Sequence, residues 1–184
     1  MDERVNRRQF LSINWGATIG FLGNFIGTQI EEERDFFRPP GASDELDFLT
    51  SCIRCAKCKD SCPEGVISLF AISDGAKLLN TPYLKPNENP CTYCKTCIDV
   101  CPTSALSLSN LLDKQAIGKA KVMQHNCITF QNVMCDYCVS SCPVNGAMEI
   151  IDGKLIINEA NCTGCGLCVA NCISDIKGIT IEPI

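Results

Sequence analysis

The sequence has little histidine and no excess of positive charge. His125 is its one histidine, which excludes His-rich zinc sites and argues against a Ser-His-Asp hydrolase. No Cys-x-x-Cys-His motif occurs, which excludes attachment of a c-type haem. The formal net charge is −5. Nucleic-acid binders instead present a basic face, so we expect no nucleic-acid partner.

The sequence also lacks enzyme motifs and a large share of ordinary apolar residues. It contains no Gly-x-Gly-x-x-Gly fingerprint, no P-loop and no acid–base constellation, so we expect no catalytic residues. The apolar share is 46%, and about 37% when cysteine is left out. Side-chain burial is thus a modest source of stability for 184 residues, and we expect another source.

Cysteine is abundant, with 16 among the 184 residues. These residues fall into four groups of four. Three groups follow the spacing Cys-x2-Cys-x2-Cys-x3-Cys, the third group has a longer first interval, and proline follows the last cysteine of the first three groups. The groups are Cys52, Cys55, Cys58 and Cys62; Cys91, Cys94, Cys97 and Cys101; Cys127, Cys135, Cys138 and Cys142; and Cys162, Cys165, Cys168 and Cys172.

The spacing within the groups is that of bacterial 4Fe-4S ferredoxins. Two short intervals form a loop that turns three thiolates toward one cluster, and the fourth cysteine comes one helical turn later and points toward a second cluster. A disulfide framework gives no reason for the repeated spacing, and structural zinc sites use separate Cys-x2-Cys pairs. We therefore expect four 4Fe-4S clusters that use all 16 cysteines as iron ligands and leave none for catalysis.

The segments between the groups predict an α+β fold of two tandem bacterial-type ferredoxin modules, each with two 4Fe-4S clusters. Apolar runs flank Asp152 and Gly153, which indicates a hairpin between groups three and four, and residues 178–181 supply a further strand. Groups one and two then form the other module, with strands at 66–69 and 105–108. Residues 71–90 are rich in turn formers and are expected to form a surface loop.

Within each module, the fourth cysteine of one group is expected to complete the cluster of the other group. The expected ligand sets are Cys52, Cys55, Cys58 and Cys101 for cluster 1; Cys91, Cys94, Cys97 and Cys62 for cluster 2; Cys127, Cys135, Cys138 and Cys172 for cluster 3; and Cys162, Cys165, Cys168 and Cys142 for cluster 4. A nested alternative pairs group one with group four and group two with group three. The sequence leaves this alternative open.

The first residues are expected to lie outside the ferredoxin fold. Arg7 and Arg8 form a twin-arginine pattern ahead of residues 9–30, which carry no charge and are long enough to cross a bilayer. Because no small-residue cleavage site follows, we expect an uncleaved anchor helix. The positive-inside rule then puts the rest of the chain on the extracytoplasmic (periplasmic) face of the membrane, after export by the Tat translocase.

Four glycines of this expected helix recur at helical spacing, so that they share one face: Gly16, Gly20, Gly23 and Gly27. A glycine ridge lets another membrane helix approach closely. Signal sequences are also glycine-rich in general, and the sequence does not decide between these two interpretations.

These observations divide the chain into five segments. The expected signal or membrane anchor is residues 1–33, followed by a linker at 34–49. The first ferredoxin module is 50–110, a connector is 111–126, and the second module is 127–184.

Four further segments of the sequence carry a resemblance to a known family. They are Arg38-Pro39-Pro40-Gly41-Ala42, Thr81-Pro82-Tyr83, Cys127-Ile128-Thr129-Phe130-Gln131 and Cys162-Thr163-Gly164-Cys165-Gly166. With these segments, the twin-arginine start and the long first interval of group three, the chain resembles the NapG/MauM family of ferredoxin-type proteins, from its start to the end of group four.

The resemblance implies a non-catalytic electron-transfer protein with four clusters. Its implied donor is a polytopic membrane quinol-oxidising protein of the NapH type. Its implied acceptor is a downstream reductase or cytochrome, such as periplasmic nitrate reductase. The alternative function is that of an iron-sulfur subunit in a molybdenum oxidoreductase complex, which nested cysteine pairing and a cleaved or absent anchor favour.

Overall fold

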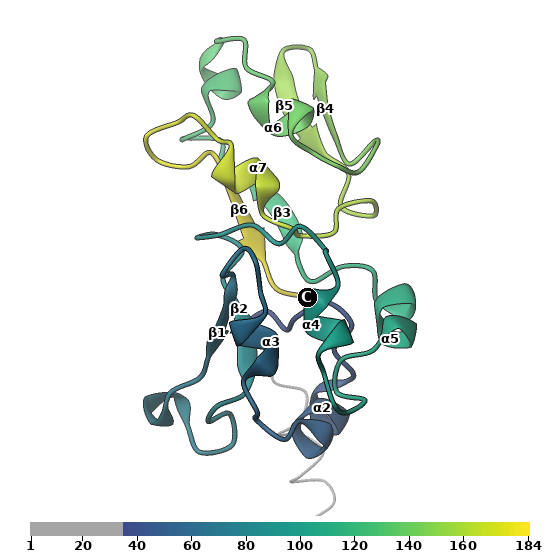
Figure 1. Ribbon diagram of the computed structural model, residues 1–184. Helices are drawn as coiled ribbons and strands as arrows, with labels where there is room; N and C mark the ends of the chain where they lie inside the picture. The colour runs from purple at the N-terminus through teal and green to yellow at the C-terminus, as the bar shows by residue number, and fades with distance from the viewer. Residues whose placement is uncertain (1–34) are drawn as a thin grey trace, which may run out of the picture. The chain divides into compact units, whose positions relative to one another are not determined.

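The computed structural model describes residues 35–184 of the chain (Figure 1). The expected signal anchor at 1–33, with Gly16, Gly20, Gly23 and Gly27, lies outside the described residues. Within 35–184, no helix is both long and apolar enough to span a bilayer.

Four one-turn helices carry the third cysteine of each group. They are α3 (Lys57–Asp60), α4 (Thr96–Asp99), α6 (Tyr137–Ser140) and α7 (Leu167–Ala170). Each helix ends two residues before the fourth cysteine of its group, whose backbone N–H donates to a carbonyl within that helix. The expectation that the fourth cysteine follows after one helical turn is therefore confirmed.

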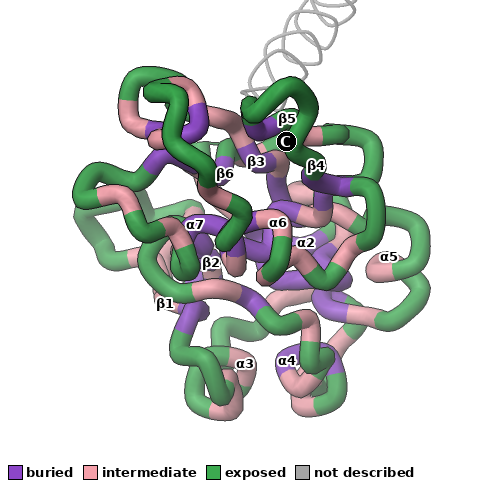
Figure 2. Tube along the Cα trace, turned by 90° about the horizontal axis from the view of Figure 1, so that it is seen from above, coloured by how far each residue is buried: buried purple, intermediate pink, exposed green. Residues whose placement is uncertain are grey.

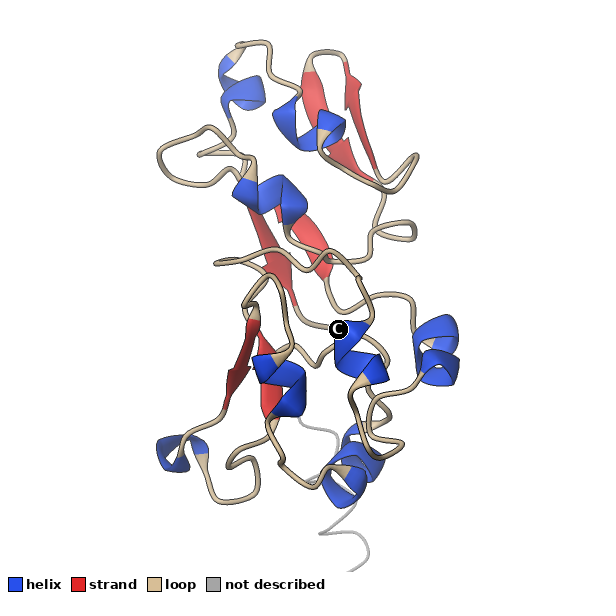
Figure 3. Ribbon diagram, viewed as in Figure 1, coloured by secondary structure: helices blue, strands red, loops and turns tan. Residues whose placement is uncertain are grey.

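The remaining helices are short as well. α2 (Glu45–Ser51) leads into Cys52 and buries Phe48 completely. α5 (Leu108–Asp113) follows group two. Two 3-10 helices are also present in the described chain. η1 (Ile72–Asp74) lies between groups one and two, and η2 (Ile128–Gln131) lies at the start of group three. Figure 3 shows that much of the chain between these elements is loop.

In the described part of the chain, the strands form three separate antiparallel pairs. β1 (Ile67–Leu69) pairs with β2 (Pro82–Leu84), β3 (Lys119–Val122) with β6 (Ile179–Glu182), and β4 (Met148–Ile151) with β5 (Lys154–Ile157). The expected hairpin around Asp152 and Gly153 is confirmed, since both residues have positive φ, as a tight two-residue hairpin turn requires. The expected strand after group four is also confirmed and is β6.

The strand predictions for the first module are partly wrong. The partner of β1 lies at Pro82–Leu84, within the segment expected to be a loop, and residues 105–108 do not form a strand. Ser107 instead caps α5, because its hydroxyl accepts a hydrogen bond of 3.2 Å from the backbone N–H of Asn110. The expected strand thus gives way to a helix start.

The expected connector 111–126 contributes a strand that the sequence did not predict. Ala120 of β3 opposes Ile181 of β6, and both are nearly fully buried. The lysines on either side of Ala120 obscured this strand in the sequence, because they leave only two apolar positions in the four-residue segment.

Two small cores hold the described chain together, and both contain cysteines. The first includes Phe48, Leu84 and Cys97, and the second includes Leu155, Ile179 and Cys168. Phe37 packs against both cores. In Figure 1 the β3–β6 pair lies between the β1–β2 pair below and the β4–β5 hairpin above, and in Figure 2 α3 and α4 lie side by side.

Candidate metal centres

Three of the cysteine groups share one loop conformation. In groups one, two and four, the residues immediately before and after the second cysteine both have left-handed backbone conformations. These residues are Arg54 and Ala56, Tyr93 and Lys95, and Gly164 and Gly166, with φ between 55° and 84°. The three loops thus direct their cysteines in the same way, as their identical spacing predicts.

Group three reaches its triplet by another path. Asp136, which follows Cys135, has a φ of −135° and is not left-handed. The long interval after Cys127 contains η2 and places Asn132 in the left-handed region instead. Thr129, which is 3% exposed, contacts Cys127 Sγ through its hydroxyl at 3.1 Å and accepts from the N–H of Leu155 at 3.4 Å. Group three is thereby tied to β5.

The first candidate site, site one, is a cavity lined by Cys52, Cys55, Cys58 and Cys101. Burial raises the pKa of Cys58 to about 11, and the charges of Cys52, Cys55 and Cys101 add to this shift. The structure therefore brings the fourth cysteine of group two to the triplet of group one.

Site two is a cavity lined by Cys62, Cys91, Cys94 and Cys97. Burial raises the pKa of Cys91 to about 11 and that of Cys97 to about 12, with further increases from the neighbouring thiols. The fourth cysteine of group one thus lies with the triplet of group two.

We call the part of the chain with groups one and two the first half and the part with groups three and four the second half. In the second half, Cys142 of group three lies near the triplet of group four. Cys168 is 4% exposed. Burial raises its pKa first, and the charges of Cys165, Cys162, Cys138 and Cys142 raise it further. We call the set Cys142, Cys162, Cys165 and Cys168 site four.

We call the set Cys127, Cys135, Cys138 and Cys172 site three. Burial raises the pKa of Cys138 to about 11, and the charges of Cys135 and Cys127 add to it. Gly178 links Cys172 to this triplet: its N–H donates to Cys172 Sγ at 3.3 Å, and its own Cα lies against Cys127, where an added Cβ would be 2.8 Å from Cys127 Cα.

The four sites fit 4Fe-4S clusters chemically. Their donors are sulfur only, and a buried thiolate needs nearby positive charge, which iron supplies. Three of the candidate ligands accept hydrogen bonds at 3.3–3.4 Å. Cys162 Sγ accepts from the backbone N–H of Ala120, Cys172 Sγ from that of Gly178, and Cys94 Sγ from the Thr96 hydroxyl. Such donors orient and tune cluster ligands. Over residues 35–184, no His, Cys, Asp or Glu trio is spaced for a single metal ion.

Arg38 is a residue whose role the sequence did not reveal. It is 5% exposed, pairs with Glu45 at 2.6 Å, and donates to Thr81 Oγ1 at 3.1 Å and to the Pro82 carbonyl oxygen at 2.6 Å. Its guanidinium also lies over the Phe48 ring. The segments before groups one and two therefore meet at Arg38.

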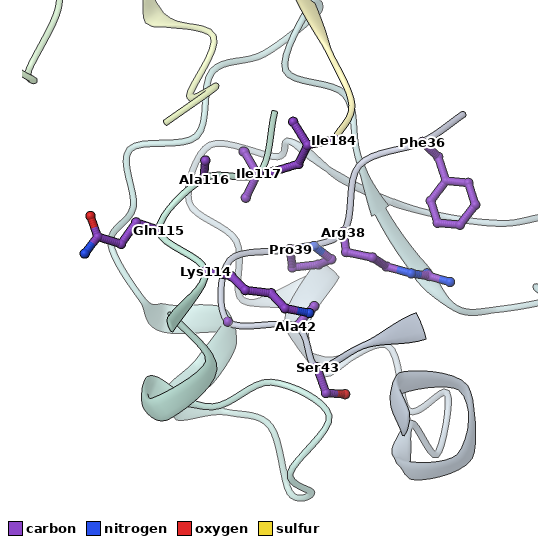
Figure 4. A pocket seen from close by; sticks show the side chains of 11 residues that line it. Phe36, Arg38, Pro39, Ala42, Ser43, Lys114, Gln115, Ala116, Ile117 and Ile184 are labelled. Carbon is purple, nitrogen blue, oxygen red and sulfur yellow. The ribbon is translucent and has the colours of Figure 1, made fainter. Parts of the chain in front are cut away.

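A separate cavity of about 240 Å³ lies beside Arg38 and contains no cysteine (Figure 4). This volume is below that of typical small-molecule pockets, about 300–1,000 Å³. Lys114, which lines it, pairs with Asp44, as Arg38 pairs with Glu45. Because no cysteine lines this cavity, it has none of the sulfur ligands of the four sites.

Comparisons with known proteins find 4Fe-4S domains over all four cysteine groups. A family model described as a 4Fe-4S dicluster domain matches residues 51–105 and 90–146, and a 4Fe-4S binding domain matches residues 162–176. The dicluster match at 51–105 spans groups one and two, and the dicluster match at 90–146 spans groups two and three.

Three relatives illustrate the similarity. The chain is 38% identical to the methylamine utilization ferredoxin-type protein MauM of Paracoccus denitrificans, over 98% of this chain and 88% of the relative. It is 30% identical to the ferredoxin-type protein NapG of Escherichia coli, over 97% and 86%. It is 32% identical to the ferredoxin-type protein NapF of Escherichia coli, over 79% and 84%. With 4Fe-4S domains and this similarity over nearly its full length, the chain belongs to the NapG/MauM family of ferredoxin-type proteins.

Proposed function

We propose that the chain is an electron-transfer protein with four 4Fe-4S clusters, one in each of sites one to four. The observation that carries this proposal is that two cavities are each lined by the triplet of one cysteine group and the fourth cysteine of the neighbouring group. The same spacing recurs in groups three and four, which supports two further sites of this kind. When bound, such clusters accept and release single electrons.

The cysteines would hold the clusters, and sites two, three and four each include buried cysteines, whereas site one has none. Cys91, Cys97, Cys127, Cys138, Cys162, Cys165 and Cys168 are buried. Cys55 and Cys94 are exposed, which leaves sites one and two with an edge toward solvent. Buried ligands lower the solvent contact that affects the reduction potential, and an exposed edge allows contact with a redox partner.

The donor sets favour a carrier over an enzyme. A cluster that binds substrate at one iron needs a site with three protein ligands, whereas every set here has four cysteines. No cysteine is left over as a nucleophile. The chain therefore supplies binding, orientation and shielding but no catalytic group.

The proposed location is the periplasmic face of the membrane, with an uncleaved anchor at 1–33. The twin arginines Arg7 and Arg8 and the uncharged stretch after them support this location. The proposed donor is a polytopic quinol-oxidising membrane protein, with a glycine ridge from Gly16 to Gly27 as the surface that docks on it. The proposed acceptor is a reductase or cytochrome, and the names of the NapG and NapF relatives favour a nitrate reductase chain.

The alternative is a permanent iron-sulfur subunit of a molybdenum oxidoreductase. Nested pairing favours this alternative, whereas Cys62 lies with the group two triplet and Cys101 with the group one triplet. The proximity of these residues therefore supports the carrier.

Anaerobic purification of the full chain from its native membranes tests the proposal. The expected result is a 4Fe-4S protein that stays with the membrane fraction, co-purifies with a polytopic membrane protein and is reduced by a quinol. Co-purification with a molybdenum-containing subunit supports the alternative. An iron-free protein contradicts both functions.

A further inference from the structure

The four sites can be ordered from the helices that carry their cysteines. α3 carries Cys58 of site one and packs against α4, which carries Cys97 of site two. α6 carries Cys138 of site three and packs against α7, which carries Cys168 of site four. Site one therefore neighbours site two, and site three neighbours site four.

The two halves meet at the loops of groups two and four. The backbone N–H of Cys91 donates to the carbonyl oxygen of Cys165 at 2.7 Å. The carbonyl oxygen of Thr163 accepts from the Tyr93 hydroxyl at 2.7 Å and from the N–H of Ile117 at 3.0 Å. Cys91 belongs to site two and Cys165 to site four, so these two sites face each other across the contact.

Two glycines make this close contact possible. A Cβ on Gly166 would lie 2.2 Å from the carbonyl oxygen of Pro86, and one on Gly164 would lie 2.4 Å from that of Gly118. Both distances are too short for any side chain, so only glycine allows the group four loop to approach Pro86 of the first half and Gly118 of the connector. The two glycines of group four therefore permit this close approach.

Asn87 fixes the contact from a second position. Its side-chain nitrogen donates to the carbonyl oxygen of Ile181 at 2.9 Å, and its side-chain oxygen accepts from the N–H of Ile181 at 2.7 Å. The Asn87 amide thus bonds both backbone groups of Ile181, as a residue of a neighbouring strand would, and it holds β6 to the loop that precedes group two. Relative rotation of the two halves about the Cys91–Cys165 contact would break these bonds.

Sites one and three lie away from the contact, and each has exposed residues beside it, as site two has at Cys94. Cys55, Arg54 and Lys57 of the site one loop are exposed. In the interval before Cys135 of site three, Val133 is 51% and Met134 is 98% exposed. Figure 1 shows α3 and α4 on one side of the β3–β6 pair and α6 and α7 on the other.

We propose that the four sites form a single row in the order one, two, four, three, and that electrons cross between the halves at the Cys91–Cys165 contact. This inference rests on the proposed function. One electron that enters at either end leaves at the other end, so no bond of the chain changes and no co-reactant is consumed. Sites one and three are the ends that meet the two redox partners, and the chain order of the groups differs from their order in space.

Electron paramagnetic resonance (EPR) of the fully reduced, anaerobically purified full chain tests the order. Magnetic interaction between clusters falls steeply with distance, so each signal is split by its neighbours. Cys55→Ala identifies the site one signal as the one that is lost. Cys94→Ala, at site two, is expected to remove the splitting of that signal. Cys135→Ala is the matched control at site three and is expected to leave the splitting unchanged.

A site one signal that stays split in Cys94→Ala would overturn the order, as would one that loses its splitting in Cys135→Ala. If a variant does not fold, diffraction from the unmodified chain at the iron absorption edge gives the four cluster positions directly. The expected map has sites two and four as the nearest pair across the halves, and any other nearest pair contradicts the inference. Absence of iron contradicts the proposed function instead.

Discussion

The hydroxyl of Tyr93 donates a hydrogen bond of 2.7 Å to the carbonyl oxygen of Thr163, which joins the loop of group two to the loop of group four. Burial raises the pKa of the Tyr93 phenol, so the hydroxyl stays protonated and remains a donor. The bond is one of the few side-chain links that tie the two halves together over the described residues.

Tyr93→Phe removes this link and nothing else of the side chain. Because a buried hydrogen bond contributes about 1 kcal/mol net, the thermal midpoint of the anaerobic protein is expected to fall by about 2–4 °C. Tyr137→Phe is the control, because Tyr137 is 55% exposed. Equal midpoints for the two variants would show that the Tyr93 hydroxyl does not stabilise the contact.

Arg38→Met is expected to destabilise the first half strongly. It leaves the Glu45 carboxylate without its guanidinium partner where only 19% of the Glu45 side chain is exposed. Loss of one partner of a buried pair costs about 3 kcal/mol or more, which corresponds to a fall of about 6–12 °C in the thermal midpoint.

The control for Arg38→Met is Lys85→Met, which removes the exposed pair of Lys85 with Glu88. An exposed pair contributes less than about 1 kcal/mol, so the midpoint is expected to move by only a few degrees. Differential scanning calorimetry measures both variants. A small effect of Arg38→Met would contradict a central role for Arg38.

Gly166→Ala is expected to disturb the contact between the halves. The new methyl group would meet the Pro86 carbonyl oxygen at 2.2 Å, in addition to the strain of alanine at a φ of 84°. Gly75→Ala carries the same kind of backbone strain at a φ of 101° but meets no atom within 4 Å. Gly166→Ala should therefore lose about 2 kcal/mol more than Gly75→Ala, as measured by thermal unfolding. Equal losses in the free energy of unfolding for the two variants would show that the close approach of Gly166 to Pro86 does not constrain the side chain at position 166.

Ligand variants distinguish adjacent from nested cysteine pairing. Cys101→Ala is expected to abolish the same EPR signal as Cys55→Ala, because Cys101 lines the cavity of site one with Cys55. Under nested pairing, Cys101 would instead complete the triplet of group three. Loss of the same signal in Cys101→Ala and Cys135→Ala would therefore refute adjacent pairing.

The sequence predicted the features that local spacing controls. The one-turn helices before Cys62 and its counterparts, the Asp152-Gly153 hairpin and β6 all follow from patterns within a few residues. The cysteines that line the cavities of sites one and two are those that the spacing predicts, whereas the four ligand sets and their binding of clusters stay predictions. The partners of β1 and β6 were missed because strand pairing depends on contacts distant in sequence, and three-residue or lysine-containing strands give weak periodicity.

The contact between the halves could not be predicted for a related reason. The glycines of group four suggested close backbone approach, but the sequence alone does not say that Pro86 and Gly118 are the neighbours. Arg38 was visible only as part of a family segment, since its partners Thr81 and Pro82 lie more than 40 positions away. Packing between distant segments decides both features.

The most direct test of the account is the content of iron, inorganic sulfide and disulfide in the anaerobically purified full chain. Four 4Fe-4S clusters predict about sixteen iron and about sixteen sulfide ions per chain, and no disulfide among the 16 cysteines. A fully folded protein with about eight irons or fewer, or with its cysteines paired as disulfides, would show that the four cysteine sets do not each bind one cluster.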